Sequence, residues 1–415
     1  EAENKPHSQP PPSWSDLPLD LAGLVLRLLP GYADRARFAA VCPQWRAAAR
    51  QQLRTPSLPL LVLPDGTFYS LPYEEPFCFP GCGFAGYKSA CGSWLVFPRD
   101  DGCFLVNPFS RATMTLPPLS SVRLRPPSAV AKWSYEHGSK FAVPYTTWMH
   151  INDSEKLHII KLILCSPNLV AALVGVEHTS QILMCQPGAL SQILMCQPGA
   201  SSWSVRAYDQ CKGFEDMAFY QGKLYTIAND ENLLVVNISQ DHSTGDPQVS
   251  RIGQIIKGEP WYPAVFEDDT MCCKKLYLVE SHGVLLMARR TIMCRVPGPG
   301  AVPIEVAGLT GFEVYKADFE HSRWVKVSTV GDDQLLFLGR RCSRAMSVSQ
   351  YGLPGDYILF LDDDEENRMD YCYDRENTSF GAYKLGSDGV LFPHPYISWK
   401  LCDEMRLAAW LFPRD

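Results

Sequence analysis

A glycine-rich segment at residues 81–86, GCGFAG, has the glycine spacing of a dinucleotide-binding fingerprint. That fingerprint requires a strand before it and a helix after it, because the N-terminus of the helix holds the pyrophosphate. Here Pro80 comes directly before the segment, no strand leads into it, and the residues that follow are typical of a strand. We therefore expect a turn at 81–86 and no nucleotide cofactor.

The cysteines, histidines and acidic residues do not form a pattern of metal ligands. Cys78 and Cys82 are close in sequence, as are Cys272 and Cys273, but neither pair has a second Cys or His pair nearby, and the nine histidines are dispersed. The acidic run at 362–366 lacks the glycine turn and terminal ligand of a calcium loop. These patterns indicate small buried thiols and a solvated acidic loop, and we expect no metal site.

The sequence also lacks a recognisable catalytic nucleophile. There is no G-x-S-x-G elbow, and the Ser, His and Asp residues show no spacing that suggests a triad. Arg340, Arg341 and Arg344 offer an anion-binding edge, although pairing with nearby acidic residues is the favoured interpretation. Trp203 and Trp324 lie on expected strands, where tryptophan packs in a core more often than it forms a ligand platform. We therefore expect a non-catalytic chain with no cofactor.

The composition excludes several classes of partner. The 415 residues are 46% hydrophobic and 20% charged, which is typical of a globular protein. The net charge is -7 with no long basic tract, which argues against nucleic acid. The longest apolar stretch, 162–176, is interrupted by Ser166-Pro167-Asn168, so we expect no membrane span. Fifteen cysteines without paired spacing favour a reducing compartment, and with no apolar signal core at the start we expect the nucleus or the cytoplasm.

Helical patterns occupy residues 13–53, after a polar, proline-rich segment at 1–12 that we expect to be a disordered lead-in. An apolar stripe beginning at Leu17 recurs at helical spacing and stops at Pro30-Gly31. Asp34 is expected to cap a second helix, and Pro43 to open a third. About 40 residues bury too little core to be comfortable alone, so we expect an obligatory partner or packing on the next domain. A three-helix unit of this size has more apolar residues than its interior can bury, so some must face another protein.

These residues resemble an F-box, which has an LP start, an L-L-P end to its first helix and a V-C-x-x-W-R finish. The resemblance covers residues 14–50 and departs from the family at Ala22-Gly23, where acidic or longer residues are common. It implies that the helices dock on a Skp-type adaptor and, through it, on cullin. The residues that the resemblance assigns to this contact are Leu17, Pro18, Leu21, Leu24, Leu28, Leu29, Phe38, Val41, Cys42 and Trp45.

Residues 58–415 consist mainly of short strand patterns. Segments 92–97, 222–227 and 283–288 each place a strand after a turn glycine, and each is followed by a further strand. Four strands repeated at roughly 40–55 residues are typical of propeller blades. We therefore predict a mainly β protein with a small N-terminal α unit, in which an all-β propeller of five to six blades follows the helices. The predicted blades are 84–119, 157–208, 216–255, 275–329 and 335–385, with a sixth built from 58–71 and residues near the C-terminus.

Segments 105–109, 116–119, 311–319, 323–325, 331–339 and 349–356 resemble a plant F-box family whose shared C-terminal region is known only as a domain of unknown function. The resemblance implies a substrate-recognition adaptor of a Skp–cullin–F-box ubiquitin ligase, which recruits an unidentified target protein for ubiquitination. The alternative is an F-box scaffold or transcriptional cofactor that acts outside degradation. A propeller enzyme or sugar-binding propeller is disfavoured because the expected site residues are missing.

A separate repeat lies inside the propeller region. The string SQILMCQPGA occurs at 180–189 and again at 191–200 without a single difference. Such identity beside diverged blades indicates a recent tandem duplication. We expect one copy to fill a blade strand and the other to be looped out or to form an extra hairpin.

Overall fold

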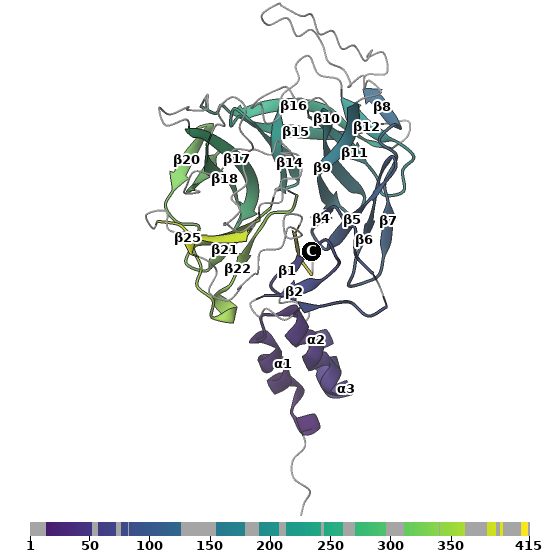
Figure 1. Ribbon diagram of the computed structural model, residues 1–415, viewed down its shortest axis with the longest axis vertical. Helices are drawn as coiled ribbons and strands as arrows, with labels where there is room; N and C mark the ends of the chain where they lie inside the picture. The colour runs from purple at the N-terminus through teal and green to yellow at the C-terminus, as the bar shows by residue number, and fades with distance from the viewer. Residues whose placement is uncertain are drawn as a thin grey trace, which may run out of the picture.

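The computed structural model describes residues 14–51, 57–71, 76–81, 83–125, 155–178, 191–206, 213–241, 245–259, 270–295, 311–339, 341–361, 380–386, 391–392 and 408–413. A small helical unit lies against the rim of a ring of β-sheets (Figure 1). The expected lead-in at 1–12 lies outside the described residues.

The helical unit contains a 3-10 turn, η1 (Trp14–Asp16), and the helices α1 (Leu19–Arg27), α2 (Tyr32–Val41) and α3 (Pro43–Gln51). Pro43 opens α3 as predicted, because proline at the first helical position loses no hydrogen bond. The prediction that Asp34 caps α2 is wrong. Gly31 occupies the cap position, and Asp34 lies in the first turn, where it pairs with Arg37 at 3.2 Å.

Small side chains fill the interior of this unit. Ala22, Leu26, Phe38 and Ala48 are buried, and so is Gly23. The unusual Ala22-Gly23 pair therefore faces inward, where it lets α1 approach its neighbours closely. Leu26 is the one leucine of α1 that this small interior buries, whereas Leu19, Leu21 and Leu24 are exposed.

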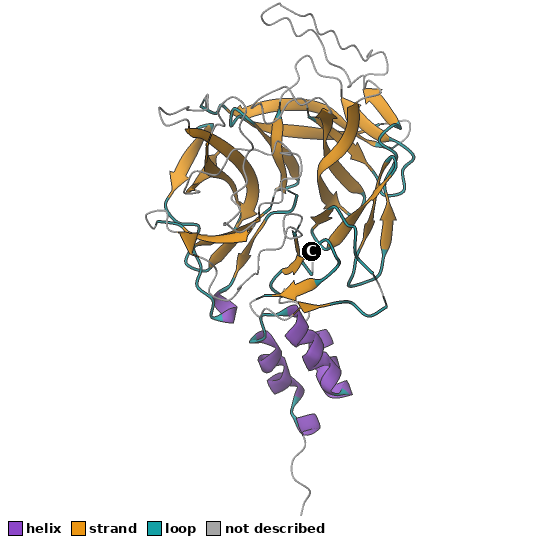
Figure 2. Cartoon of the chain, in the orientation of Figure 1, coloured by secondary structure: helices purple, strands orange, loops and turns teal. Residues whose placement is uncertain are grey.

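Six sheets follow, and each is one blade of a propeller (Figure 2). Blades 2, 4 and 5 are four-stranded antiparallel sheets in chain order. Blade 2 contains β4 (Ser89–Cys91), β5 (Trp94–Arg99), β6 (Gly102–Val106) and β7 (Thr113–Thr115). Blade 4 contains β13 (Phe214–Tyr220), β14 (Lys223–Ala228), β15 (Leu233–Gln240) and β16 (Pro247–Ile256). Blade 5 contains β17 (Thr270–Ser281), β18 (Val284–Arg295), β19 (Gly311–Asp318) and β20 (Arg323–Val327).

Blades 3 and 6 have five strands rather than the expected four. In blade 3, β8 (Val122–Arg125) pairs in parallel with β12 (Trp203–Arg206), outside the antiparallel β9 (Glu155–Ser166), β10 (Leu169–His178) and β11 (Gln192–Cys196). In blade 6, β21 (Gln334–Leu338) pairs with β22 (Arg344–Ser347) and, in parallel, with β23 (Tyr357–Leu361). The turn η2 (Ser349–Tyr351) lies between β22 and β23, and β24 (Phe380–Lys384) and β25 (Leu391–Phe392) complete the sheet.

Blade 1 joins the two ends of the propeller, as predicted. It contains β1 (Leu60–Val62), β2 (Phe68–Ser70), β3 (Pro76–Phe77) and the last strand, β26 (Ala409–Leu411). β26 pairs antiparallel with β1, with Trp410 opposite Leu61. The indole of Trp410 is fully buried and donates to the carbonyl of Leu338 in blade 6 at 3.2 Å. This pairing covers the edge of β1 that would otherwise be free, and it holds the two ends of the propeller together in one sheet.

The tryptophans of the outer strands also connect neighbouring blades. Trp203 is fully buried, and its Nε1 donates to the carbonyl of Pro117 at 2.9 Å, so the expectation of a core role holds for this residue. Trp324 differs from that expectation because it is only half-buried. Its Nε1 donates to the carbonyl of Glu231 at 2.9 Å, and its ring packs against the core between blades 4 and 5.

The second copy of the duplicated string forms β11, between β10 and β12. The first copy, 180–189, lies outside the described residues.

Candidate functional site

The helical unit exposes a group of large apolar side chains. They are Leu19, Leu21, Leu24 and Val25 of α1, Leu28 directly after it, Trp14 before it and Val41 at the end of α2. Pro18 is exposed beside them. We call these eight residues the apolar helical surface. Leu28 is 71% and Trp14 75% exposed, so water contacts most of each side chain.

The residues that the F-box resemblance assigned to adaptor contact divide into two groups. Five belong to the apolar helical surface: Pro18, Leu21, Leu24, Leu28 and Val41. The others are buried or half-buried. Leu17, Leu29, Phe38 and Trp45 build the small helical core, and the Sγ of half-buried Cys42 accepts the backbone N–H of Trp45 at 3.4 Å.

Trp45 is held from two sides. Its ring stacks on Phe38 with centroids 4.4 Å apart, and its Nε1 donates to the carbonyl of Trp14 at 3.2 Å. This residue therefore supports the helices from within as well as presenting part of its ring to solvent.

Sequence reasoning did not assign Trp14, Leu19 or Val25 to the surface. The available signal was the Ala22-Gly23 pair: when the inward face of a short helix is small, its large apolar residues are left on the other face. Helical periodicity shows which residues share a face, but not which face meets the core.

The first turn of α2 attaches the helical unit to the propeller. Tyr32 lies among three phenylalanine rings of blades 1 and 2, with centroid distances of 6.3 Å to Phe77, 6.0 Å to Phe79 and 5.1 Å to Phe109. The backbone N–H of Ala33 donates to Ser70 Oγ at 3.2 Å. We call this contact the Tyr32 joint.

Arg35 extends the Tyr32 joint to blade 6. Its guanidinium donates to the hydroxyl of Tyr351 at 3.2 Å and lies over the same ring. Burial raises the pKa of Tyr351, and the nearby Arg35 opposes that rise. The joint therefore contacts blades 1, 2 and 6, and it fixes the helical unit at the place where the ring closes.

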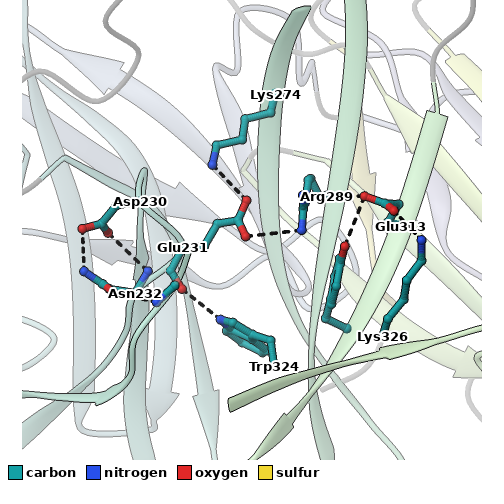
Figure 3. A network of polar contacts seen from close by, with 10 residues as sticks. Asp230, Glu231, Asn232, Lys274, Arg289, Glu313, Trp324 and Lys326 are labelled. Carbon is teal, nitrogen blue, oxygen red and sulfur yellow. Dashed lines mark hydrogen bonds and ion pairs between the residues drawn. The ribbon is translucent and has the colours of Figure 1, made fainter. Parts of the chain in front are cut away.

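A network of polar contacts around Glu231 links blades 4 and 5 (Figure 3). Glu231, in the turn between β14 and β15, has a positive φ of 63° and a buried carboxylate. The carboxylate pairs with Lys274 at 2.9 Å and with Arg289 at 3.4 Å, both in blade 5. Burial lowers the pKa of Lys274, and its hydrogen bond to Glu231 opposes that shift. This cluster therefore links two blades.

Asp216, on β13, joins three blades with a single carboxylate. Its Oδ1 contacts Lys161 of β9 at 2.5 Å, and its Oδ2 accepts the backbone N–H of Leu278 in β17 at 2.8 Å. Both charged side chains of the pair are almost completely buried. Burial raises the pKa of Asp216, whereas Lys161 and the hydrogen bonds act in the opposite direction.

The described residues of the glycine-rich segment and of the arginine group make turns and contacts within the propeller. Gly81 and Gly86 have positive φ in turns before β4, so a strand follows them rather than a helix. Arg341 donates to the carbonyl of Lys88, and Arg344 lies over the ring of Phe412. Cys82, Arg340 and the acidic run 362–366 lie outside the described residues, as do the side chains of Cys272 and Cys273. In the described part of the chain, no three His, Cys, Asp or Glu side chains gather as a metal site would require.

None of the described helices is long and apolar enough to cross a membrane.

Comparison with known families agrees with this two-part architecture. The F-box domain family matches residues 14–56, and the KIB1-4 beta-propeller family matches residues 60–384. The Arabidopsis thaliana F-box protein At2g26160 is 23% identical over 362 residues, covering 85% of this chain and 96% of its own. F-box only protein 7 from the same plant is 21% identical over 417 residues, covering 96% and 94%. F-box protein SKIP23, also from that plant, is 23% identical, covering 81% and 80%. The chain thus belongs to the plant F-box proteins that carry a KIB1-4 β-propeller.

Proposed function

We propose that the chain is the substrate-recognition subunit of a Skp–cullin–F-box ubiquitin ligase. F-box domains generally bind Skp-type adaptors, and F-box proteins with a propeller generally serve such ligases as substrate adaptors. The observation that carries the proposal is the apolar helical surface, because large side chains kept in water by a small folded unit are characteristic of a docking surface.

In this role the propeller holds the target, and the helices hold the ligase. An F-box joined to a propeller fits a non-catalytic adaptor fold. Its contribution is proximity, since fixing a target lysine near the loaded conjugating enzyme raises the effective concentration of the two reactants. The Tyr32 joint supports this role because it restricts how far the target can swing away. We place the complex in the nucleus or the cytoplasm.

The first test is adaptor binding by the Leu24→Gln/Leu28→Gln double variant. Both side chains are at least half exposed, and glutamine is a good helix former, so the helix should persist. Interface anchors commonly contribute about 2 kcal/mol or more, so the Kd for a purified Skp-type adaptor should rise at least ~30-fold. Isothermal calorimetry on the full chain measures it.

The matched control is Val325→Gln, which changes an exposed apolar residue of β20 to the same polar residue. It should leave the Kd for the adaptor unchanged. Unchanged adaptor binding by the double variant would overturn the proposed docking surface. Capture of the adaptor without cullin from plant extract would instead favour an F-box scaffold outside degradation.

A further inference from the structure

Blade 3 buries β11 on both faces. Ile193 and Met195 pack toward blade 4, and Leu194 and Cys196 pack into the core shared with blade 2. The first three of these side chains are fully buried, and Cys196 nearly so. A charged residue in the middle of this strand would therefore normally abolish the blade.

The rest of the second copy also makes specific contacts. Ser191 Oγ accepts the backbone N–H of Phe214 at 2.7 Å and lies 3.2 Å from its carbonyl. Gln197 Nε2 donates to the carbonyl of Gly245 at 3.2 Å, and Gly199 adopts a φ of +78°. The first copy has the same residue types at the corresponding positions, Ser180, Gln186 and Gly188. Placed in β11, it would reproduce every contact of the second.

We propose that the two copies are interchangeable occupants of β11, so that the first copy replaces the second when the second is disabled. The connections allow the exchange. β11 pairs with β10 as far as Val174. The connection from β10 to β11 therefore runs over residues 175–191, and the connection from β11 to β12 runs over residues 197–202. With the first copy in place these spans become 175–180 and 186–202. The long and short connections change places, so loop closure costs the same in both arrangements.

One difference makes the observed arrangement the preferred one. Val176, Glu177 and His178 now extend β10 along β9 beyond the end of β11. A connection that returns from Val174 to residue 181 in six residues must draw part of this segment away from β9. The first copy is therefore a reserve strand rather than an equal alternative.

The test is a charged residue in one copy at a time. Leu194→Asp should leave a folded, monomeric protein because Leu183 of the first copy takes its place, and Leu183→Asp alone should also fold. The double variant should lose at least tenfold in recovery of soluble monomer. Leu173→Asp on β10 is the matched control: it is equally buried, pairs with Ile193 and has no duplicate, so it should fail like the double variant.

Thiol labelling followed by mass spectrometry distinguishes replacement of the second copy by the first from a fold that simply tolerates Asp at position 194 in β11. In Leu194→Asp, Cys196 should become at least tenfold more reactive than in the unaltered chain. A folded Leu194→Asp variant in which Cys196 stays protected would overturn the proposal. So would a Leu194→Asp variant that fails as completely as Leu173→Asp.

A single-copy chain provides the last control. Deleting 180–190 and deleting 190–200 produce the same polypeptide, so this chain has only one possible β11. Leu194→Asp in that background should not fold. Recovery there equal to that of the two-copy Leu194→Asp variant would show that the spare copy provides no rescue.

Discussion

The helical unit and the propeller treat large apolar side chains in opposite ways. Among the described residues, nine such side chains are exposed, and seven of them lie between Trp14 and Val41. In the described part of the six blades, only Phe319 and Val325 are exposed. In a closed ring each blade covers the face of the next, so apolar strands find partners within the chain. Apart from the Tyr32 joint, the three helices have no such neighbour, and the exposed apolar side chains that result are the basis of the proposed docking surface.

The propeller also buries charge, which the helical unit does not. The Lys161–Asp216 pair and the Lys274–Glu231 pair both lie between blades. Buried pairs of this kind contribute little when intact, but removal of one partner is costly because the other is left unpaired. Three changes follow from this contrast, in order of expected effect.

Replacing Lys161 with Met should produce a large loss of stability, equalled only by the loss of the buried Trp203. The buried carboxylate of Asp216 would lose its cation, which typically costs about 3–5 kcal/mol of unfolding free energy near neutral pH. Denaturant titration of the purified chain measures the loss. The matched control is Lys326→Met, which breaks an exposed pair with Glu313 and should cost less than about 1 kcal/mol.

The same variant should respond to pH in a defined direction. Burial already raises the pKa of Asp216, and removing Lys161 removes an opposing influence, so the folded-state pKa rises further above the unfolded value. Between the folded-state pKa of the unaltered chain and the higher folded-state pKa of the variant, only the folded variant binds this proton. The loss should therefore shrink by up to ~1.4 kcal/mol for each pH unit as the pH falls through that range. A loss that grows on acidification would contradict the assignment.

Replacing Trp203 or Trp324 with Ala should lower the free energy of unfolding by different amounts. Trp203 is fully buried, so its loss should cost about 3–5 kcal/mol, whereas half-buried Trp324 should cost roughly 1–3 kcal/mol. Both changes also remove a hydrogen bond to a backbone carbonyl of the neighbouring blade, so the difference in unfolding free energy reports burial. Equal losses from the two variants would contradict the difference in burial.

The smallest effect is expected at Leu21 of the apolar helical surface. Leu21→Gln should change the stability of the helices by no more than about 0.5 kcal/mol, because Leu21 is already 45% exposed. Phe38→Ala, at a buried position in the same unit, should cost at least about 2 kcal/mol. Hydrogen exchange of the α1 and α3 amides measures both. A large loss from Leu21→Gln would mean that Leu21 belongs to the core.

The sequence predicted the repeating part of this fold and missed its exceptions. A turn glycine followed by an apolar strand recurs in several blades, so the blade segments and the closure through blade 1 could be predicted. The parallel pairs β8–β12 and β21–β23 join segments that no local turn connects, and local patterns carry no signal for them. The Lys161–Asp216 pair was missed for a similar reason, because its partners lie 55 residues apart in different blades.

The candidate site was predicted in part for a different physical reason. The helices and their apolar residues were expected from spacing and from the F-box resemblance, yet Phe38 turned out to be core and Leu19 exposed. The orientation of α1 depends on how closely it approaches α3, which is decided by Ala22, Gly23 and Ala48 together. That is a property of three-dimensional packing, which no single helix pattern contains.

The pairing of β26 with β1 means that blade 1 can be completed only at the end of synthesis. β1 leaves the ribosome about 350 residues before β26, which at roughly 5–20 residues per second is about 20–70 seconds. During that interval blade 1 lacks a strand, and Tyr351, which receives Arg35, is itself made late. The helices leave the ribosome before the propeller does, but the Tyr32 joint and its Arg35–Tyr351 contact can form completely only near the end of synthesis. In the proposed role, a nascent chain would present its adaptor-docking helices before its target-holding ring is complete, so unfinished copies would be exposed to the ligase.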